Sequence, residues 1–362
     1  MRYSRLGESG LVVSRVALGC LTFGATGDSP IYKVDQAGAD RIVGRALDRG
    51  VTFFDTSDLY AAGLSETFLG AALRGRRDEI VVTSKAGFRV GEGIGDAGLS
   101  RRHLMRAIDG TLQRLGTDHV DLYLAHKEDP LTPLDETLQA LDDIVRAGKA
   151  RYVGFSNWSA WLAATALERQ RRMGLAPFVS GQVAYSLVQR DAEYELLPFM
   201  DRFGIGATAW SPLAGGFLSG KYDRASVRDG TTRVGISSLP YDRERGFAIV
   251  DVLREIAAAR GCTVAQAAIA WTLVRDVVSS ALIGVSRIEQ LDSAIDAADI
   301  VLDDDEIARL ETASTLPPLY PHWHIASSHD RRLFETLGQA LPETPGGSGR
   351  TSIADVAATK RP

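Results

Sequence analysis

Short apolar runs and longer stretches with apolar residues at helical spacing alternate along most of this chain. A short apolar run predicts a strand buried on both faces, and helical spacing predicts a helix with one buried side. The predicted strands cover residues 16–18, 52–54, 80–83, 120–124, 152–154, 179–183, 205–209 and 281–283. The predicted helices cover residues 39–47, 65–73, 101–115, 134–147, 160–172, 194–203, 264–274 and 288–298.

These elements form about eight strand–helix units, the number that closes a parallel barrel. An opening hairpin over 3–6 and 11–14 and an extra helix over 243–260, before the last units, complete the prediction. The alternative is an open doubly wound sheet, which usually carries a G-x-G-x-x-G turn after its first strand. Here that turn reads Gly19-Cys20-Leu21-Thr22-Phe23-Gly24. We therefore predict an α/β fold of the (β/α)8 TIM-barrel type.

The pattern changes near residue 317, where a Pro- and aromatic-rich stretch ends at His324. We expect a barrel domain over 1–315 and a C-terminal segment over 316–340 that lies near the barrel mouth. A helix is predicted near 332–337. Residues 341–362 contain a Pro, Gly and Ser-rich stretch, which predicts a flexible tail.

The charge balance disfavours several classes of partner. Lys and Arg number 41 against 46 Asp and Glu, so the chain lacks the basic excess typical of nucleic-acid binding. The charged N-terminus does not resemble a signal peptide, and no apolar window reaches the roughly 18 residues that a membrane span needs. Only Cys20 and Cys262 are present, which favours a reduced, cytoplasmic protein. Oligomeric state stays open.

Polar residues follow three neighbouring predicted strands at the point where each apolar run ends. Asp55, Lys85 and His126 hold these positions, and Tyr60 lies one short loop after Asp55. Because the carboxyl ends of barrel strands meet at one rim, the four side chains should share a pocket. Each alone has an ordinary structural explanation, such as a helix cap or a loop aromatic. Four together at consecutive strand ends favour catalysis.

The chemistry of these four groups suits carbonyl reduction. A phenol with a reference pKa of about 10 becomes a usable acid near neutrality when a cation stands beside it. Lys85 would supply the cation, and Asp55 would hold the ammonium in place. His126 would donate a hydrogen bond to the carbonyl oxygen and stabilise the developing alkoxide.

Three blocks of this sequence resemble the aldo-keto reductase family over about residues 1–315. They are the run from Phe53 to Glu66, the run from Val82 to Lys85, and the run from Asp121 to His126. The resemblance implies a (β/α)8 barrel that reduces aldehydes or ketones with a nicotinamide cofactor. The family's catalytic tetrad falls on Asp55, Tyr60, Lys85 and His126.

The same resemblance implies a dinucleotide site at the later strand ends. Ser156, Asn157 and Gln182 would bind the nicotinamide amide, and Trp210 would stack on the ring. The other implied contacts are Gly19, Cys20, Leu21, Asp55, Ser211, Pro212, Leu213, Ala214, Gly215, Lys221, Arg233, Gly284, Ser286, Arg287 and Gln290. Ser211 and the small residues after it follow a predicted strand, where backbone amides can approach a pyrophosphate.

We favour NADPH over NADH, the alternative cofactor, because Ser286 and Arg287 would pair with a 2′-phosphate that NADH lacks. The sequence departs from the family at Ser293-Ala294, where the family often has Glu-Asn against the adenine. That difference weakens the preference for NADPH, and it leaves the reaction class unchanged.

Two other functions are open to a chain of this pattern. A nucleotide-sensing interaction module of the same fold, similar to potassium-channel β subunits, would bind the nucleotide with little catalysis. A metal-dependent barrel hydrolase or lyase is disfavoured because the six histidines are scattered, and we expect no metal. His322 and His324 flank Trp323, which favours an aromatic turn. The small-molecule carbonyl or alcohol substrate is not defined by any motif.

Overall fold

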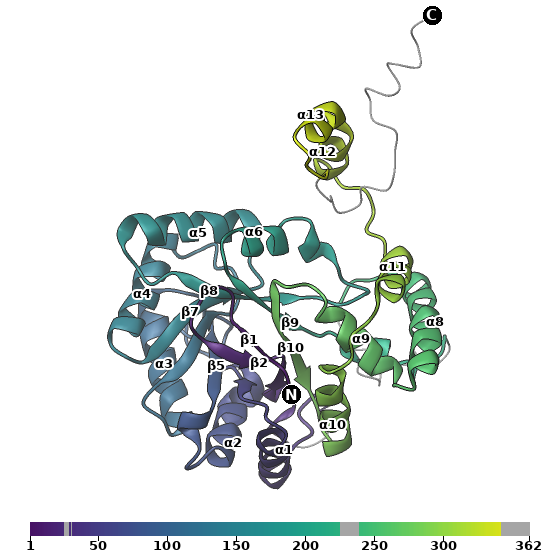
Figure 1. The fold of residues 1–362 in the computed structure, drawn as a ribbon. Coiled ribbons are helices and arrows are strands. Elements are labelled where there is room, and N and C mark those ends of the chain that lie inside the picture. The colour runs from purple at the N-terminus through teal and green to yellow at the C-terminus, as the bar shows by residue number, and fades with distance from the viewer. Residues whose placement is uncertain (25–28, 30, 225–238, 342–362) are drawn as a thin grey trace, which may run out of the picture.

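The computed structural model describes residues 1–24, 29, 31–224 and 239–341. Eight parallel strands close into a barrel in the order β10-β3-β4-β5-β6-β7-β8-β9 (Figure 1). The prediction of a (β/α)8 barrel is therefore confirmed. The strands are β3 (Val16–Gly19), β4 (Phe53–Asp55), β5 (Val81–Ala86), β6 (Val120–Ala125), β7 (Ala150–Ser156), β8 (Phe178–Ala184), β9 (Gly206–Trp210) and β10 (Val278–Gly284).

A ring of helices surrounds the barrel (Figure 1). The ring and its additions comprise α1 (Gln36–Asp48), α2 (Leu64–Ala72), α3 (Arg101–Leu115), α4 (Leu134–Arg146), α5 (Ala160–Met173), α6 (Leu196–Arg202), α8 (Arg243–Arg260), α9 (Val264–Thr272), α10 (Ile288–Ala297) and α11 (Asp304–Ala313). The extra helix before the last units is α8, as predicted. Helix α11 was not predicted from the sequence.

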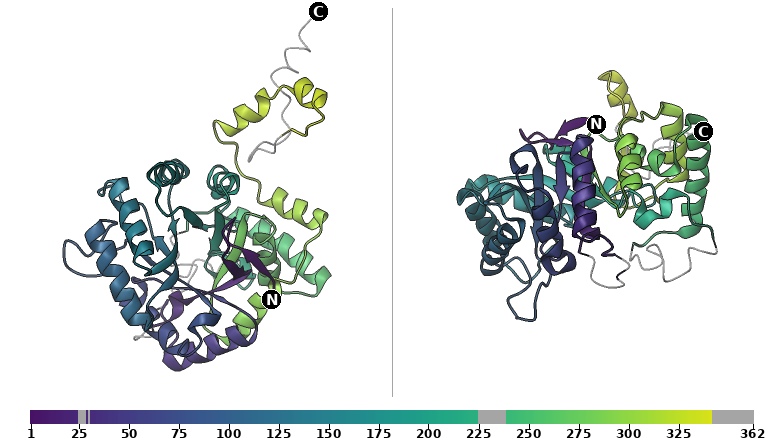
Figure 2. Two further views of the ribbon diagram at one scale, coloured as in Figure 1. Left: turned by 60° about the vertical axis from the view of Figure 1, so that its left-hand side comes forward. Right: turned by 90° about the horizontal axis from the view of Figure 1, so that it is seen from below.

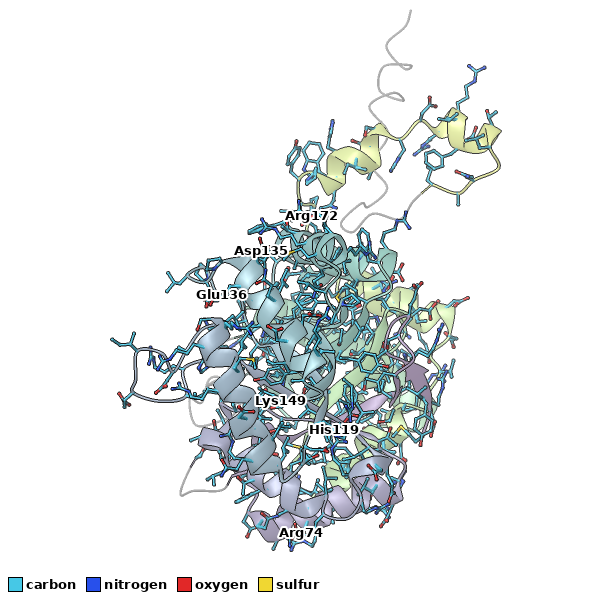
Figure 3. All side chains as sticks on the ribbon, turned by 90° about the vertical axis from the view of Figure 1, so that its left-hand side faces the viewer. Arg74, His119, Asp135, Glu136, Lys149 and Arg172 are labelled. Carbon is cyan, nitrogen blue, oxygen red and sulfur yellow. The ribbon has the colours of Figure 1, made fainter. Side chains whose placement is uncertain are left out.

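Local sequence signals explain where two of these helices begin or end. Ser100 is the N-cap of α3, and its side chain accepts a hydrogen bond from the His103 N–H. Gly50, just after α1, has φ of +79°, a left-handed conformation that glycine adopts without steric cost. Charged side chains such as Asp135, Lys149 and Arg172 lie on the outer surface of the ring (Figure 3).

An antiparallel hairpin closes the amino-terminal end of the barrel (Figure 2). It consists of β1 (Tyr3–Arg5) and β2 (Val12–Ser14), and the predicted opening hairpin is confirmed. Leu6 and Val13 are fully buried in a cluster with Phe53 and Leu122 of the barrel strands. Because the hairpin covers this end, a ligand must approach the strands from their carboxyl ends.

The C-terminal segment contains α12 (His322–Ser328) and α13 (Arg331–Thr336), so the predicted helix near 332–337 is present. Figures 1 and 2 show both helices outside the ring, beyond α6 and α11, whereas we expected the segment near the barrel mouth. Tyr194 contacts this segment: its hydroxyl donates a hydrogen bond to the Pro317 carbonyl, and its ring packs on His322. Neither helix buries a residue, so packing does not draw them over the strands.

The three-part domain division stays a prediction, and the expected tail over 342–362 lies outside the described residues. Within the described ranges, no helix is both long enough and apolar enough to cross a membrane.

Candidate active site

Strand register brings the predicted polar residues to one rim. Asp55 is the last residue of β4 and pairs with Gly19 of β3, which pairs in turn with Gly284 of β10. Lys85 lies one residue before the end of β5, opposite Leu124 of β6. His126 follows directly after β6. The predicted catalytic positions on the strands therefore occupy the carboxyl ends of consecutive strands.

The ammonium of Lys85 is the centre of this group. Its Nζ donates to Asp55 Oδ1 at 2.5 Å and to the Thr56 carbonyl at 2.7 Å. It also lies 3.4 Å from the Tyr60 hydroxyl, in hydrogen-bonding geometry. Three acceptors match the three N–H groups of an ammonium. Lys85 is 0% exposed, so the surrounding strands hold this charge in a single position.

Burial and the charges of this group together set the pKa values of Tyr60, Lys85 and Asp55. Burial raises the pKa of Tyr60, and although Lys85 opposes this effect, the net direction is upward. We expected Lys85 to lower the phenol pKa, and here burial outweighs it. Burial lowers the pKa of Lys85, but Asp55 and Tyr60 raise it by more. Burial also raises the pKa of Asp55 against the pull of Lys85. Tyr60 is thus held as a neutral phenol beside a cation.

His126 stands next to Tyr60 with its ring fixed on two sides. Its ring centroid is 5.9 Å from that of Tyr60 and 4.7 Å from that of Phe88, both in edge-on geometry. Its Nδ1 is 3.1 Å from Ser57 Oγ. Burial, followed by the charge of Lys85, holds the pKa of His126 well below its usual value of 6.5. The imidazole is therefore neutral near pH 7, with one nitrogen protonated.

The residues predicted to bind the nicotinamide amide form a hydrogen-bonded chain beside this group. Gln182 Nε2 donates to Asp55 Oδ2 at 2.8 Å, and Ser156 Oγ donates to the Gln182 carbonyl at 3.0 Å. Asn157 Nδ2 donates to the His126 carbonyl at 3.1 Å. Trp210 Nε1 donates to Asn157 Oδ1 at 3.1 Å. The structure thus joins the predicted amide site directly to the predicted catalytic residues.

The stretch after β9 makes a compact turn, and most of it lies in the 3-10 segment η5 (Ala214–Ser219). Positive φ values occur at Ser211 (+58°), Ala214 (+48°), Gly215 (+68°) and Gly216 (+98°). Such conformations are costly for residues with a side chain, and they persist where the surroundings enforce them. Of the other predicted contacts here, Pro212 is buried, Leu213 is half-buried and Lys221 is exposed with its Nζ 4.8 Å from the Tyr222 ring centroid.

The turn before α10 carries the predicted phosphate contacts. Gln290 Oε1 accepts the Ser286 N–H at 3.0 Å, and Arg287 is an exposed residue at the N-cap of α10. Thr22 Oγ1 donates to the Val285 carbonyl at 2.6 Å. This bond ties the turn to the Gly19, Cys20 and Leu21 segment, where Cys20 is fully buried and Leu21 is half-buried.

A guanidinium, a hydroxyl and the N-terminus of a ten-residue helix suit a phosphate, so the residues present fit a nicotinamide dinucleotide phosphate. Ala294, where the family often has Asn, is buried in α10 at 3% exposure and offers no polar group to the adenine. Arg233, also predicted as a cofactor contact, lies outside the described residues.

Sequence reasoning missed Ser57, whose Oγ lies 3.1 Å from His126 Nδ1, and Asp58, whose Oδ1 lies 3.3 Å from that same Oγ. Both stand inside the run from Phe53 to Glu66, and a hydroxyl and a carboxyl between Asp55 and Tyr60 were the available signal. Phe88, which packs on His126, was also missed, because nothing in its local sequence separates it from an ordinary loop aromatic.

In the ranges that the structure describes, no three His, Cys, Asp or Glu side chains gather where they could hold a metal ion. His322 and His324 lie on α12, outside the barrel. His119 lies on the outer surface of the molecule, beside Asp118 (Figure 3).

An ammonium, a carboxylate, a phenol and an imidazole meet at the carboxyl-terminal rim of a closed parallel barrel, the place where barrel enzymes have their active sites. The chain matches the model of the aldo/keto reductase family over residues 15–315. It therefore belongs to that family and is an oxidoreductase of it.

Three relatives show the range of this similarity. The chain is 33% identical to the versiconal hemiacetal acetate reductase of Aspergillus parasiticus, over 89% of this chain and 99% of the relative. It is 38% identical to the uncharacterized oxidoreductase YrpG of Bacillus subtilis (strain 168), over 86% and 94%. It is 35% identical to a probable voltage-gated potassium channel subunit beta of Arabidopsis thaliana, over 83% and 92%.

Proposed function

We propose that this protein is an NADPH-dependent reductase of aldehydes or ketones, with the reverse oxidation open to the same site, and that Tyr60 is its general acid. The observation that carries the proposal is the position of the fully buried Lys85 Nζ, which lies 2.5 Å from Asp55 Oδ1 and 3.4 Å from the Tyr60 hydroxyl. A buried cation so close to a neutral phenol serves proton transfer better than it serves stability.

When bound, NADPH supplies the hydride that adds to the carbonyl carbon. Tyr60 gives its phenolic proton to the carbonyl oxygen as negative charge develops there. The nearby Lys85 stabilises the phenolate that remains, since an adjacent cation favours the charged form of the phenol. Asp55 keeps Lys85 charged and fixed through the 2.5 Å bond. In the oxidation direction the same groups take the proton from an alcohol.

His126 assists by a hydrogen bond to the same oxygen. Because its pKa is held well below 6.5, it acts as a neutral donor and does not compete with Tyr60 to supply the proton. Its ring centroid lies 5.9 Å from that of Tyr60 in edge-on geometry, which supports a shared role of both groups at one oxygen. A fixed donor aimed at a developing oxyanion is worth a large part of the rate in such sites.

The cofactor would lie across the later strand ends. Gln182, Ser156 and Asn157 have amide and hydroxyl groups for the carboxamide, and Trp210 has a ring for stacking. Arg287 and Ser286 at the N-terminus of α10 would bind the 2′-phosphate, which is the basis for NADPH over NADH. Gln182 now donates to Asp55, so bound nucleotide would share or replace that bond.

The second candidate function is nucleotide-dependent interaction with a partner protein. It is favoured by the 35% identity to a protein named as a probable potassium channel subunit beta. The complete set of Asp55, Tyr60, Lys85 and His126 supports catalysis over this alternative.

The test is a panel of simple aldehydes and ketones with NADPH and with NADH, followed at the absorbance band of the reduced nicotinamide. Nucleotide affinity is measured in parallel by fluorescence titration. We expect turnover with several aldehydes and tighter binding of NADPH. Tight NADPH binding without turnover of any carbonyl or alcohol would overturn the reductase proposal and favour the interaction module.

A further inference from the structure

His126 can help a carbonyl oxygen only from a nitrogen that carries a proton. Its Nδ1 points at Ser57 Oγ, at 3.1 Å, which leaves Nε2 for the pocket. A neutral imidazole has one N–H, so a proton on Nε2 requires Nδ1 to be an acceptor. The hydroxyl of Ser57 must then donate to Nδ1. The acceptor to which the Ser57 hydroxyl donates therefore decides which nitrogen of His126 carries the proton.

Ser57 has one proton and more than one acceptor within reach. Its Oγ lies 3.1 Å from His126 Nδ1, 3.3 Å from Asp58 Oδ1 and 3.3 Å from the Lys85 carbonyl. It also accepts the Leu59 N–H at 3.3 Å. Ser57 is 0% exposed, so water does not easily supply a substitute partner. His126, Asp58 and the Lys85 carbonyl thus compete for the proton on Ser57 Oγ, and of the three only Asp58 changes from acceptor to donor when it takes up a proton.

Asp58 is a buried carboxyl with incomplete hydrogen bonding. It is 4% exposed, and its Oδ2 has no hydrogen-bond partner in the described part of the chain. The ionisable groups that face it are Glu66 of α2, Arg114 of α3 and Tyr123 of β6. Burial, followed by the charge of Glu66, raises the pKa of Asp58 to about 7. On the other side, Lys85 is the charged group that acts on His126.

We propose that Asp58, acting through Ser57, is a positioning group that decides which nitrogen of His126 carries the proton. Neither residue touches the reacting atoms, and both act through His126. The proposal rests on the proposed function in one respect only, the use of Nε2–H toward a carbonyl oxygen. The coupling between Asp58 and His126 is a property of the protein without any ligand.

The two states balance in protons. With Asp58 protonated, its O–H donates to Ser57 Oγ, Ser57 donates to Nδ1, and Nε2 carries the imidazole proton into the pocket. When Asp58 releases its proton to solvent, the Ser57 hydroxyl turns to the carboxylate. Nδ1 then takes a proton from solvent as Nε2 gives one up, and Nδ1–H donates to Ser57 Oγ. The donor toward the carbonyl is lost while the net imidazole charge is unchanged.

Nitrogen NMR of ¹⁵N-histidine protein without nucleotide tests this directly, because the two tautomers give different ¹⁵N shifts. The His126 signal is identified by its loss in His126→Gln. In the wild type we expect mainly Nε2–H below the Asp58 pKa of about 7 and a shift toward Nδ1–H above it. In Asp58→Asn the ratio should not change with pH. Equal tautomer ratios in the wild type and Asp58→Asn at every pH would overturn the proposal.

A second arm separates this role from a structural one. Ser57→Ala should remove the pH dependence of the tautomer, whereas Ser14→Ala removes an equally buried hydroxyl at the closed end of the barrel and should leave it intact. In kinetics, kcat/KM for reduction should fall about tenfold above the transition in the wild type and stay level in Asp58→Asn. A kcat/KM profile that Asp58→Asn leaves unchanged would count against the role in catalysis.

The two proposals fail separately. A protein that reduces no carbonyl but shows the tautomer shift would contradict the proposed function alone. A reductase whose His126 tautomer ignores Asp58 would contradict this inference alone.

Discussion

Gln182 Nε2 donates a 2.8 Å hydrogen bond to Asp55 Oδ2 across the mouth of the barrel, from β8 to β4. These strands lie on opposite sides of the closed strand order. Because Asp55 Oδ1 accepts from Lys85, both oxygens of this buried carboxylate are occupied. One bond thus joins the predicted cofactor amide site to the predicted acid–base group.

Removing that bond should weaken the fold and the cofactor site together. Gln182→Met keeps the length of the side chain but leaves Asp55 Oδ2 without its donor, which should cost about 1–3 kcal/mol of unfolding free energy. Chemical denaturation measures the loss. Gln113→Met, at an exposed position on α3, is the matched control and should change stability little. Equal stability of the two variants would show that the Gln182 bond contributes nothing.

Breaking the Lys85–Asp55 pair should separate stability from activity. Lys85→Met leaves a buried carboxylate without its counter-ion and should cost about 3–5 kcal/mol. The double variant Lys85→Met with Asp55→Leu removes both charges and should regain most of that loss while staying inactive. Denaturation curves and turnover assays on the three proteins decide the point. Activity in the double variant would contradict the role of the ion pair.

The sequence was sufficient for the barrel because two periodicities alternate regularly along it. Short apolar runs become strands buried on both sides, as in β3, and helical spacing becomes the outer ring. Helix α11 lies after the eighth strand–helix unit, so the repeating pattern did not predict it. Its capping box, formed by Asp303 and Glu306, was the available signal. The placement of α12 and α13 could not be predicted, since neither has a face that the barrel buries.

The convergence of the predicted catalytic residues could be found from the sequence because the carboxyl ends of barrel strands meet at one rim. Asp55, Lys85 and His126 needed only the strand assignments, and Tyr60 needed also its position one short loop after Asp55. The sign of the Tyr60 pKa shift could not be found that way, because it depends on how burial compares with the charge of Lys85. The bond from Gln182 to Asp55 depends on side-chain direction across the barrel, which no local pattern encodes.

Arg287 should decide the preference for NADPH. Arg287→Ala removes the exposed guanidinium at the N-terminus of α10, and the loss of a charge-assisted bond predicts roughly 10- to 100-fold weaker NADPH binding. NADH affinity should stay nearly constant, because NADH lacks the 2′-phosphate. Fluorescence titration with both nucleotides serves as measurement and control. A similar loss for both would place Arg287 outside the phosphate site.

Asp58 should make the stability of the protein depend on pH. Its pKa is raised in the folded state from 3.8 to about 7, so its contribution is fully present below 3.8 and is lost as pH rises through 7. Asp58→Asn cannot lose a proton. As pH rises from about 5 to about 8, the unfolding free energy of Asp58→Asn should increase by roughly 2–3 kcal/mol relative to that of the wild type. Parallel pH profiles for the two proteins would mean that Asp58 titrates normally.

The most direct test of the central claim is Tyr60→Phe, which removes the phenolic proton while keeping the ring beside His126 and Lys85. Single-turnover reduction of an aldehyde by bound NADPH should slow by about 10²- to 10⁴-fold, with NADPH affinity nearly unchanged. That result would identify Tyr60 as the proton donor. A Tyr60→Phe variant that reduces the aldehyde at the wild-type rate would contradict the account.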